Sequence, residues 1–298
     1  MKKREAKALK ESTYTLIYTV LFIVFLSLVV VSIANSLFFK HPDRINVVFY
    51  GEKTAIYSWG RTNNVNYFLP MYPDLKILVP GGYGYYRVGA LGKLISLEKK
   101  PELFTRSFSS TSSNFIDYYF YPKGDSIYYG KTPDLTVYFP SFYQIWFSPS
   151  NTYFIDKLYL WLVFTFAKRS DFISIRTYPT KSIGQETLLD EENFAKRFQG
   201  LFYYRTYRDE KRVVQIMYTK EYKSAVIASR ILEGVGIRVV DISQQDKQPK
   251  VCAVYEGGER FSQTAQGLSH FFHCKLVKGK TGVSDIILDL GDTETLWR

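Results

Sequence analysis

The stretch VVQIMYTKEYKSAVIASRILEGVGIRVVDI, residues 213–242, decides the fold. It begins and ends with runs rich in β-branched residues, which favour strands. Between these runs, residues 221–233 place small and branched apolar side chains on one side of a helix, and Gly234 follows as a stop signal. The stretch therefore predicts a strand, an amphipathic helix and a second strand.

The same alternation continues toward the C-terminus. We expect strands at 251–255, 275–277 and 285–290, and a helix at 261–272. Strands that alternate with helices of 10–13 residues form small α/β domains. We place this domain at residues 211–298, with its boundary at the charged stretch 207–212.

Residues 40–210 contain further apolar and aromatic runs and are expected to form an α/β domain outside the membrane. The expected strands are 45–50, 76–79, 115–121 and 135–139, and the expected helices are 87–97, 158–167 and 191–204. The run at 158–167 is too short to span a bilayer, so we expect a buried helix there. The segment GGYGYY at 81–86 lacks the spacing of phosphate-binding loops, so we expect a turn there.

The N-terminus predicts a membrane anchor. Residues 12–39 are 28 residues without a charge, and a helix of roughly 20 apolar residues spans a bilayer. Residues 1–11 carry five Lys or Arg against two Glu, and short basic flanks stay in the cytoplasm. We expect one transmembrane helix in the plasma membrane, a cytoplasmic tail at 1–11 and an extracytoplasmic part at 40–298. A cleaved signal peptide is the alternative, but its apolar region is only about 7–15 residues long.

Composition excludes several classes of protein. Aromatic residues make up 17% of the 298 residues, which argues against intrinsic disorder. Two cysteines are too few for a disulfide-dense scaffold. The net charge of +11 is dispersed outside the N-terminal tail, so we expect no nucleic-acid partner, whereas anionic lipid or an anionic envelope polymer would suit it.

The C-terminal pattern resembles a domain found at the end of many LytR-CpsA-Psr proteins. The resemblance covers residues 211–292 and is carried by the first strand, the Ala-rich helix, GIRV at 236–239 and SDIILDLG at 284–291. It implies a bacterial cell-envelope protein.

Residues 44–208 resemble, more weakly, the catalytic domain of the same family. NVVFYG at 46–51 is similar to its opening strand, DLKILVPG at 74–81 to its Pro-Arg-Asp-x-x-V-x-I-P-G segment, and RVGA at 87–90 to its Lys-Ile-Asn-Ala. That family transfers lipid-linked anionic glycopolymers to the cell wall, using a divalent metal and arginines around a pyrophosphate.

The family's motif is eroded here. Pro73 stands where the family has arginine, Glu52 and Lys53 follow Gly51 where it has a metal-binding aspartate, and its later arginine cluster is reduced to Arg176. A pyrophosphate leaving group needs concentrated positive charge and metal. The sequence therefore favours a non-catalytic protein that binds or scaffolds wall glycopolymer or a lipid-linked sugar, without a metal site or cofactor.

Two alternatives remain open. A divergent phosphotransferase would use Asp74, Arg87 and Mg²⁺, and a docking module would bind another envelope protein. For the binding function, the candidate ligand contacts are aromatic and basic, because aromatic faces pack on sugars and polyprenyl chains. These candidates are Tyr83, Tyr85, Tyr86, Arg87 and Arg176.

Cys252 and Cys274 form a candidate disulfide, since an extracytoplasmic location permits one. The alternative is two buried free thiols. Zinc bound by these cysteines with His270 and His273 is not expected, because the usual paired-ligand spacings are missing.

Overall fold

The computed structural model describes residues 18–27, 29–34, 36–132, 134–246 and 249–298. The chain divides into two compact units. One comprises residues 1–42 with 152–166, and the other residues 43–151 with 167–298. The predicted boundaries at residues 40 and 211 stay predictions.

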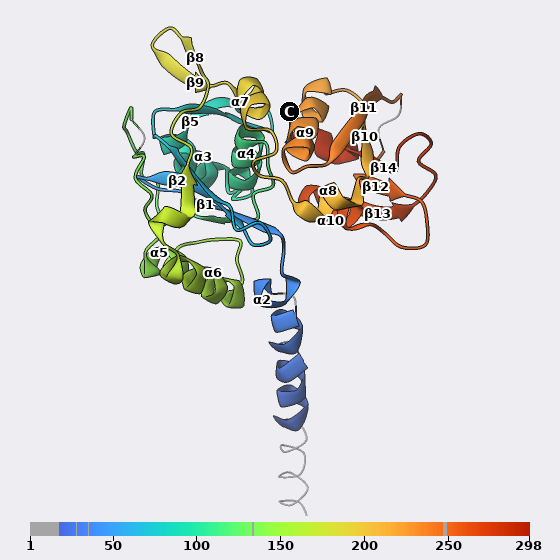
Figure 1. Ribbon diagram of the computed structural model, residues 1–298, viewed down its shortest axis with the longest axis horizontal. Helices are drawn as coiled ribbons and strands as arrows, with labels where there is room; N and C mark the ends of the chain where they lie inside the picture. The colour runs from blue at the N-terminus through green and yellow to red at the C-terminus, as the bar shows by residue number, and fades with distance from the viewer. Residues whose placement is uncertain (1–17, 28, 35, 133, 247–248) are drawn as a thin grey trace, which may run out of the picture. The chain divides into compact units, whose positions relative to one another are not determined.

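The described residues of the first unit are mainly helical. Residues 18–27 and 29–34 are helical, and α2 (Leu37–Lys40) and α6 (Phe154–Phe166) lie against each other (Figure 1). Part of the predicted transmembrane segment, residues 12–17, 28 and 35, lies outside the described residues. Over the residues that are described, no helix has the length and hydropathy that a bilayer span requires.

The expected buried helix at 158–167 differs from helix α6 in its start and in its burial. It begins earlier, at Phe154, and only Asp156, Leu160 and Phe164 are buried. These three residues are four apart and therefore share one face of the helix. Apolar side chains lie on all sides of the helix, whereas the buried residues lie on that single face.

The second unit begins with a five-stranded sheet of order β6-β1-β2-β3-β7. Its strands are β1 (Arg44–Phe49), β2 (Thr54–Gly60), β3 (Asn66–Met71), β6 (Tyr118–Phe120) and β7 (Phe172–Ser174). Strands β1, β2 and β3 pair antiparallel, while β6 runs parallel to β1 and β7 parallel to β3. All six residues of β1 are buried, so this strand lies at the centre of the core.

A smaller sheet of order β5-β4-β9-β8 and several helices complete this part. The strands are β4 (Lys76–Val79), β5 (Gly84–Arg87), β8 (Thr180–Ile183) and β9 (Glu186–Leu189). The helices are η1 (Val88–Ala90), α3 (Leu91–Glu98), α4 (Leu103–Ser112), α5 (Phe142–Phe147), η2 (Arg169–Asp171), α7 (Glu191–Phe198) and α8 (Arg205–Glu210). Apolar side chains of β1–β4, α3, α4 and α7 share one core.

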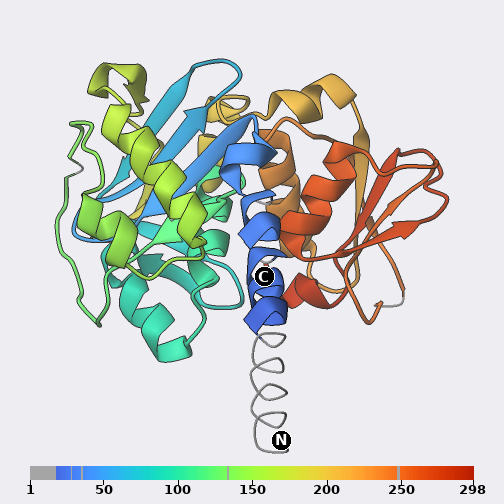
Figure 2. The same cartoon turned by 90° about the horizontal axis from the view of Figure 1, so that it is seen from below.

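The C-terminal residues form a mixed sheet of order β11-β10-β14-β12-β13, orange to red in Figures 1 and 2. Its elements are β10 (Val213–Tyr218), α9 (Tyr222–Gly234), β11 (Arg238–Gln244), β12 (Ala253–Glu256), α10 (Gln263–Phe272), β13 (Lys275–Lys278), β14 (Ile286–Asp289) and η3 (Gly291–Leu296). Every strand and helix expected here is present. The α/β class predicted from the sequence is confirmed.

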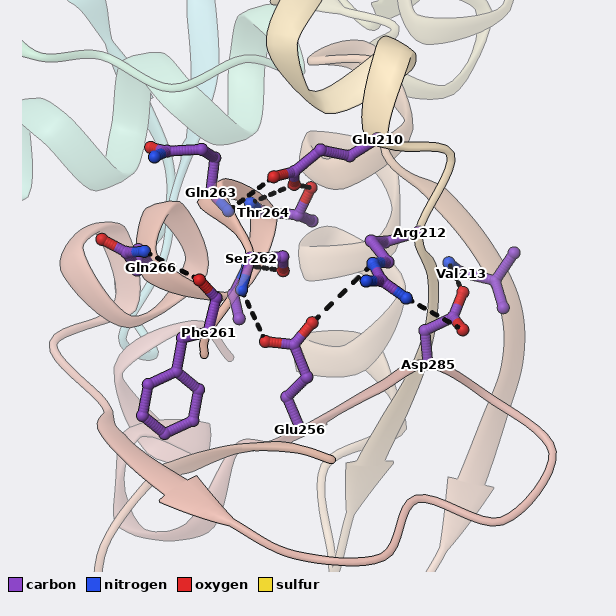
Figure 3. A network of polar contacts seen from close by, with 11 residues as sticks. Glu210, Arg212, Val213, Glu256, Phe261, Ser262, Gln263, Thr264, Gln266 and Asp285 are labelled. Carbon is purple, nitrogen blue, oxygen red and sulfur yellow. Dashed lines mark hydrogen bonds and ion pairs between the residues drawn. The ribbon is translucent and has the colours of Figure 1, made fainter. Parts of the chain in front are cut away.

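The charged stretch before β10 helps to build this sheet (Figure 3). The Glu210 carboxylate accepts hydrogen bonds from the backbone N–H groups of Gln263 and Thr264, both at 2.7 Å, at the start of α10. A carboxylate stabilises a helix N-terminus because the first N–H groups there lack partners within the helix. Arg212 bridges Glu256 and Asp285, at 3.9 and 3.6 Å.

Besides the helix at 158–167, four expected elements of residues 40–210 differ from the structure. No strand forms at 135–139. There the Ser174 hydroxyl donates a hydrogen bond to the Leu135 carbonyl, and the Tyr57 hydroxyl donates one to the Tyr138 carbonyl. The expected strand at 115–121 pairs only as β6, since the Phe115 carbonyl accepts from the Asn46 side chain.

The other two differences concern helix ends. The expected helix at 191–204 ends at Phe198, ahead of Gly200 with a φ of +81°. The expected helix at 87–97 begins after Arg87, because that residue pairs in β5 with Lys76.

Cys252 and Cys274 are joined by a disulfide, with their Cα atoms 4.7 Å apart. The bond links the residue before β12 to the residue before β13. Both cysteines belong to the core beneath α9 and α10.

Gly234→Ala should lower the free energy of unfolding by about 1–3 kcal/mol, the usual cost of overpacking. A Cβ there would collide with the backbone carbonyl oxygen of Ser113, which cannot rotate away. Without the collision, alanine in a helix would stabilise by up to about 1 kcal/mol, so the sign tests the close approach of α9 to Ser113. Urea unfolding measures it. Gly257→Ala is the control, since its Cβ would meet only the Gly279 oxygen at 3.6 Å. Equal stability of both variants would contradict this packing.

Reducing the Cys252–Cys274 disulfide should lower the free energy of unfolding by about 3 kcal/mol, because the bond closes a loop across 22 residues in the unfolded chain. The measurement compares urea unfolding with and without dithiothreitol. A variant with both Cys252→Ala and Cys274→Ala should show no response to the reductant. An unchanged midpoint for the unsubstituted protein would count against the bond.

Candidate aromatic binding site

A cavity of about 130 Å³ lies where the parallel strands β1 and β6 end. Such strand ends are common ligand sites in α/β proteins, because the loops that follow the strands converge there. The cavity is lined by Phe49, Tyr50, Gly51, Glu52, Phe120, Tyr121, Pro122, Tyr128, Gln144 and Ser148. These residues come from the ends of β1 and β6, the loop at residue 128, and α5.

Five of the ten lining residues are aromatic. The rings of Phe49 and Phe120, neighbours on the two strands, stack with their centroids 4.7 Å apart. Tyr50 meets Tyr128 edge to face at 6.0 Å. Tyr121 packs on Phe104 of α4 at 5.0 Å. Each ring is held by another ring or by the core, so the apolar wall is largely formed before any ligand arrives.

Tyr50 holds the cavity floor in place. Its hydroxyl donates to the Gly89 carbonyl at 3.0 Å and accepts from the Gly92 N–H at 2.9 Å. Burial raises the pKa of Tyr50 to about 12, so the hydroxyl stays protonated at neutral pH. Gly92 is needed for this contact, because a Cβ there would lie 2.6 Å from the Tyr50 ring.

The lining also carries polar groups. Glu52 supplies a carboxylate, and Gln144 supplies an amide whose oxygen accepts from the Ser141 N–H at 2.8 Å in a capping box at the start of α5. Among the described residues, none of the lining side chains is a lysine or arginine. The cavity can thus offer aromatic faces and a few hydrogen bonds, and it carries no positive charge of its own.

The structure brings Asp74 and Arg87 together. Their charged groups lie 3.6 Å apart, and the Arg87 guanidinium also covers the Tyr129 ring at 4.9 Å. The Asp74 N–H donates to the Gly130 carbonyl at 3.0 Å. Because Tyr128 lines the cavity and residues 129 and 130 contact this pair, the pair borders the site through one short segment.

Four of the predicted ligand contacts, Tyr83, Tyr85, Tyr86 and Arg176, lie elsewhere. The Tyr83 hydroxyl donates to Glu98 at 2.7 Å, and the Tyr85 hydroxyl donates to Glu191 at 3.2 Å. Tyr86 is 37% exposed. Arg176 is exposed in the chain after β7. None of these four side chains lines the described cavity.

Sequence reasoning missed the rings that do line it. Tyr121 ends the aromatic run at 115–121, which predicted a strand and gave no sign that its last ring faces a cavity. Tyr128 lies in a loop without a motif. Over the described residues, no group of three or more His, Cys, Asp or Glu could hold a metal ion.

A second polar cluster joins Asn46, in the middle of β1, to Tyr204, which precedes α8. The Asp117 carboxylate accepts from the Asn46 N–H at 2.7 Å and from the Tyr204 hydroxyl at 3.2 Å. The Asn46 side chain donates to the Phe115 carbonyl and to Tyr204 Oη, at 2.8 and 3.1 Å. Burial raises the pKa of Asp117 to about 7, because the loss of solvent has a larger effect than the two hydrogen bonds, which lower the pKa.

Comparison with known proteins finds similar structures. No protein-family model matches the chain, and no curated protein matches it. The structure of B. subtilis TagT is similar with a TM-score of 0.35 and 12% identity, over 52% of this chain and 88% of that chain. B. subtilis TagV gives a TM-score of 0.34 and 10% identity, over 52% and 94%.

A third similar structure is named as the LytR-CPS2A-psr family protein YwtF (TagT) with bound octaprenyl pyrophosphate lipid. It gives a TM-score of 0.22 and 14% identity, over 26% of this chain and 33% of that chain. The family that the sequence resembles is therefore also found among the structures similar to this chain.

Asp117→Asn should change the pH dependence of stability. The pKa of Asp117 is raised on folding, so between about pH 4 and 7 the unfolded chain ionises this group while the folded chain keeps it protonated. Its contribution to the free energy of unfolding is thus lost as pH rises through this window, by on the order of 2–4 kcal/mol. Asparagine keeps an acceptor oxygen for Asn46 and does not titrate.

Urea unfolding at several pH values tests this. The stability difference between Asp117→Asn and the unsubstituted protein should move in favour of the variant from pH 4 to 7. Asp125→Asn, on an exposed loop, is the control and should show no such trend. A difference that stays constant with pH at Asp117 would refute the raised pKa.

Proposed function

We propose that the chain is a membrane-anchored cell-envelope protein that binds the sugar part of a wall glycopolymer or its lipid-linked precursor. The observation that carries this proposal is the aromatic cavity at the ends of β1 and β6. Sugar rings present apolar C–H faces that pack on aromatic side chains, while Glu52 and Gln144 offer acceptors and a donor for hydroxyl groups.

The charge at the site favours binding over phosphoryl transfer. Arg87, which contacts the segment 128–130 through Tyr129, already faces Asp74 at 3.6 Å. A pyrophosphate leaving group is stabilised by uncompensated positive charge, which this pair does not supply. A neutral sugar needs no such charge, so the lining suits the sugar better than the phosphate.

The anchor and location are part of the proposal. The uncharged segment 12–39 behind a basic tail supports a single membrane span with the N-terminus in the cytoplasm and residues 40–298 outside. The disulfide between Cys252 and Cys274 supports the same orientation, since such bonds persist in oxidising compartments.

The ligand class guides the choice of probe. The resemblance of residues 44–208 and 211–292 to LytR-CpsA-Psr proteins supports an envelope glycopolymer. One similar structure is named as holding an octaprenyl pyrophosphate lipid. We therefore choose purified bacterial cell wall, with and without its attached anionic glycopolymer, as the first probe.

Tyr128→Leu should weaken binding of the detergent-solubilised full chain to glycopolymer-bearing wall by about tenfold, because one aromatic wall of the cavity is lost. Co-sedimentation over a range of wall concentrations measures the dissociation constant. Tyr86→Leu is the matched control: it replaces an exposed tyrosine of β5 that does not line the cavity.

Equal binding by Tyr128→Leu and the unsubstituted protein would refute the cavity as the site. Mg²⁺-dependent release of pyrophosphate-linked sugar that disappears in Arg87→Ala would instead support the phosphotransferase.

A further inference from the structure

Helix α6 is unusually apolar for a helix that is so little buried. Ten of its 13 side chains are apolar or aromatic, yet the buried ones are only Asp156, Leu160 and Phe164. Phe154 and Phe166, at its two ends, are 71% and 78% exposed, and the preceding Tyr153 is 77% exposed. The other apolar side chains of α6 are partly exposed, so apolar surface runs along much of the helix. Exposed apolar surface of this extent marks an interaction site.

The buried face of α6 is occupied by the chain that follows the N-terminal helix. The Asp156 carboxylate accepts from the Leu37 N–H at 2.8 Å, and the Tyr159 ring meets the Phe38 ring edge to face at 5.1 Å. Residues 37 and 38 come three and four residues after the helical segment that ends at 34. Helix α6 is therefore fixed next to the end of the apolar N-terminal segment.

The dimensions and charges of α6 fit a lipid surface. Thirteen residues extend about 20 Å, which is too short to cross a hydrocarbon core of about 30 Å. Helices of this kind lie in the interface, with aromatic side chains in the boundary between headgroups and acyl chains. Lys157 lies within the helix, Lys40 ends α2, and Lys168 and Arg169 follow α6 in the chain, so cations stand close to both ends of α6 in the sequence. Cations are attracted to anionic headgroups.

We propose that α6 lies in the outer interface of the bilayer, with Phe154 and Phe166 inserted among the lipids, and gives the protein a second membrane contact beside its anchor. This inference rests on the proposed anchor, because the contacts with Leu37 and Phe38 place α6 at the outer end of that segment. The occupant is lipid, since the exposed surface directly adjoins a segment that would itself emerge from the bilayer.

Photo-crosslinking of the full chain tests the inference. The photoreactive residue p-benzoylphenylalanine replaces, one at a time, Phe154, Phe166, Phe22 and Val283. The proteins are reconstituted in vesicles of phosphatidylglycerol and phosphatidylethanolamine. Phe22 reports on the anchor, and Val283, which is 91% exposed in the C-terminal region, is the control for an apolar side chain in water. Lipid adducts are measured by mass spectrometry.

Positions 154 and 166 should form lipid adducts at roughly ten times the level of position 283, because only an inserted side chain meets acyl chains. Adducts at position 22 without adducts at 154 and 166 would overturn the interfacial helix and leave the anchor intact. Absence of adducts at all three positions would overturn the anchor as well. Adducts to protein rather than lipid at 154 and 166 would also overturn the inference, in favour of a protein partner.

Discussion

The structure of the second unit depends on the hydrogen bonds of Asn46 at the centre of β1. Its backbone N–H donates to Asp117 and its side chain donates to Phe115 and Tyr204, so one buried residue joins β1, the approach to β6 and the chain that leads into α8. Buried donors are costly unless they find acceptors, so the N–H groups of Asn46 hold these partners in place, while Asn46 Oδ1 has no hydrogen-bond partner among the described residues. The parallel pairing of β1 with β6, which places Phe49 beside Phe120, follows from this arrangement.

The cavity lies at the C-terminal end of β1, where the paired strands β1 and β6 both end. Two parallel strands that end together leave their last side chains facing the same space, and here those side chains are aromatic. The Tyr50 hydroxyl then fastens the turn at Gly89 and Gly92 beneath it. The Tyr128 N–H also donates to the Gly89 carbonyl, at 3.0 Å. Tyr50 and Tyr128, which both line the cavity, are therefore held by the same turn.

Local signals in the sequence predicted the C-terminal region element by element, because each helix there has one apolar face and each strand is short and branched. The central sheet was harder to predict. Strand β3 contains Pro70, and the Ser- and Thr-rich helix α4 contains residues that usually favour turns. In α4 the hydroxyls of Thr111 and Ser112 donate to carbonyls four residues back, which satisfies them inside the core. Periodicity cannot reveal this compensation.

The candidate site too was predictable from the sequence only in part. The sequence singled out Asp74 and Arg87, and the structure brings their charged groups together. The sequence could not show that this pair would contact the segment 128–130. Asp74 keeps one oxygen buried without a hydrogen bond, so the charge of Arg87 nearby compensates it. Arg87 in turn holds the Tyr129 ring, and Gly130 accepts from the Asp74 backbone. In this chain the pair therefore acts as a support for the loop that carries Tyr128. A charged pair can support a loop in this way, because orienting a loop needs only mutual compensation, whereas stabilising a leaving group needs charge left over.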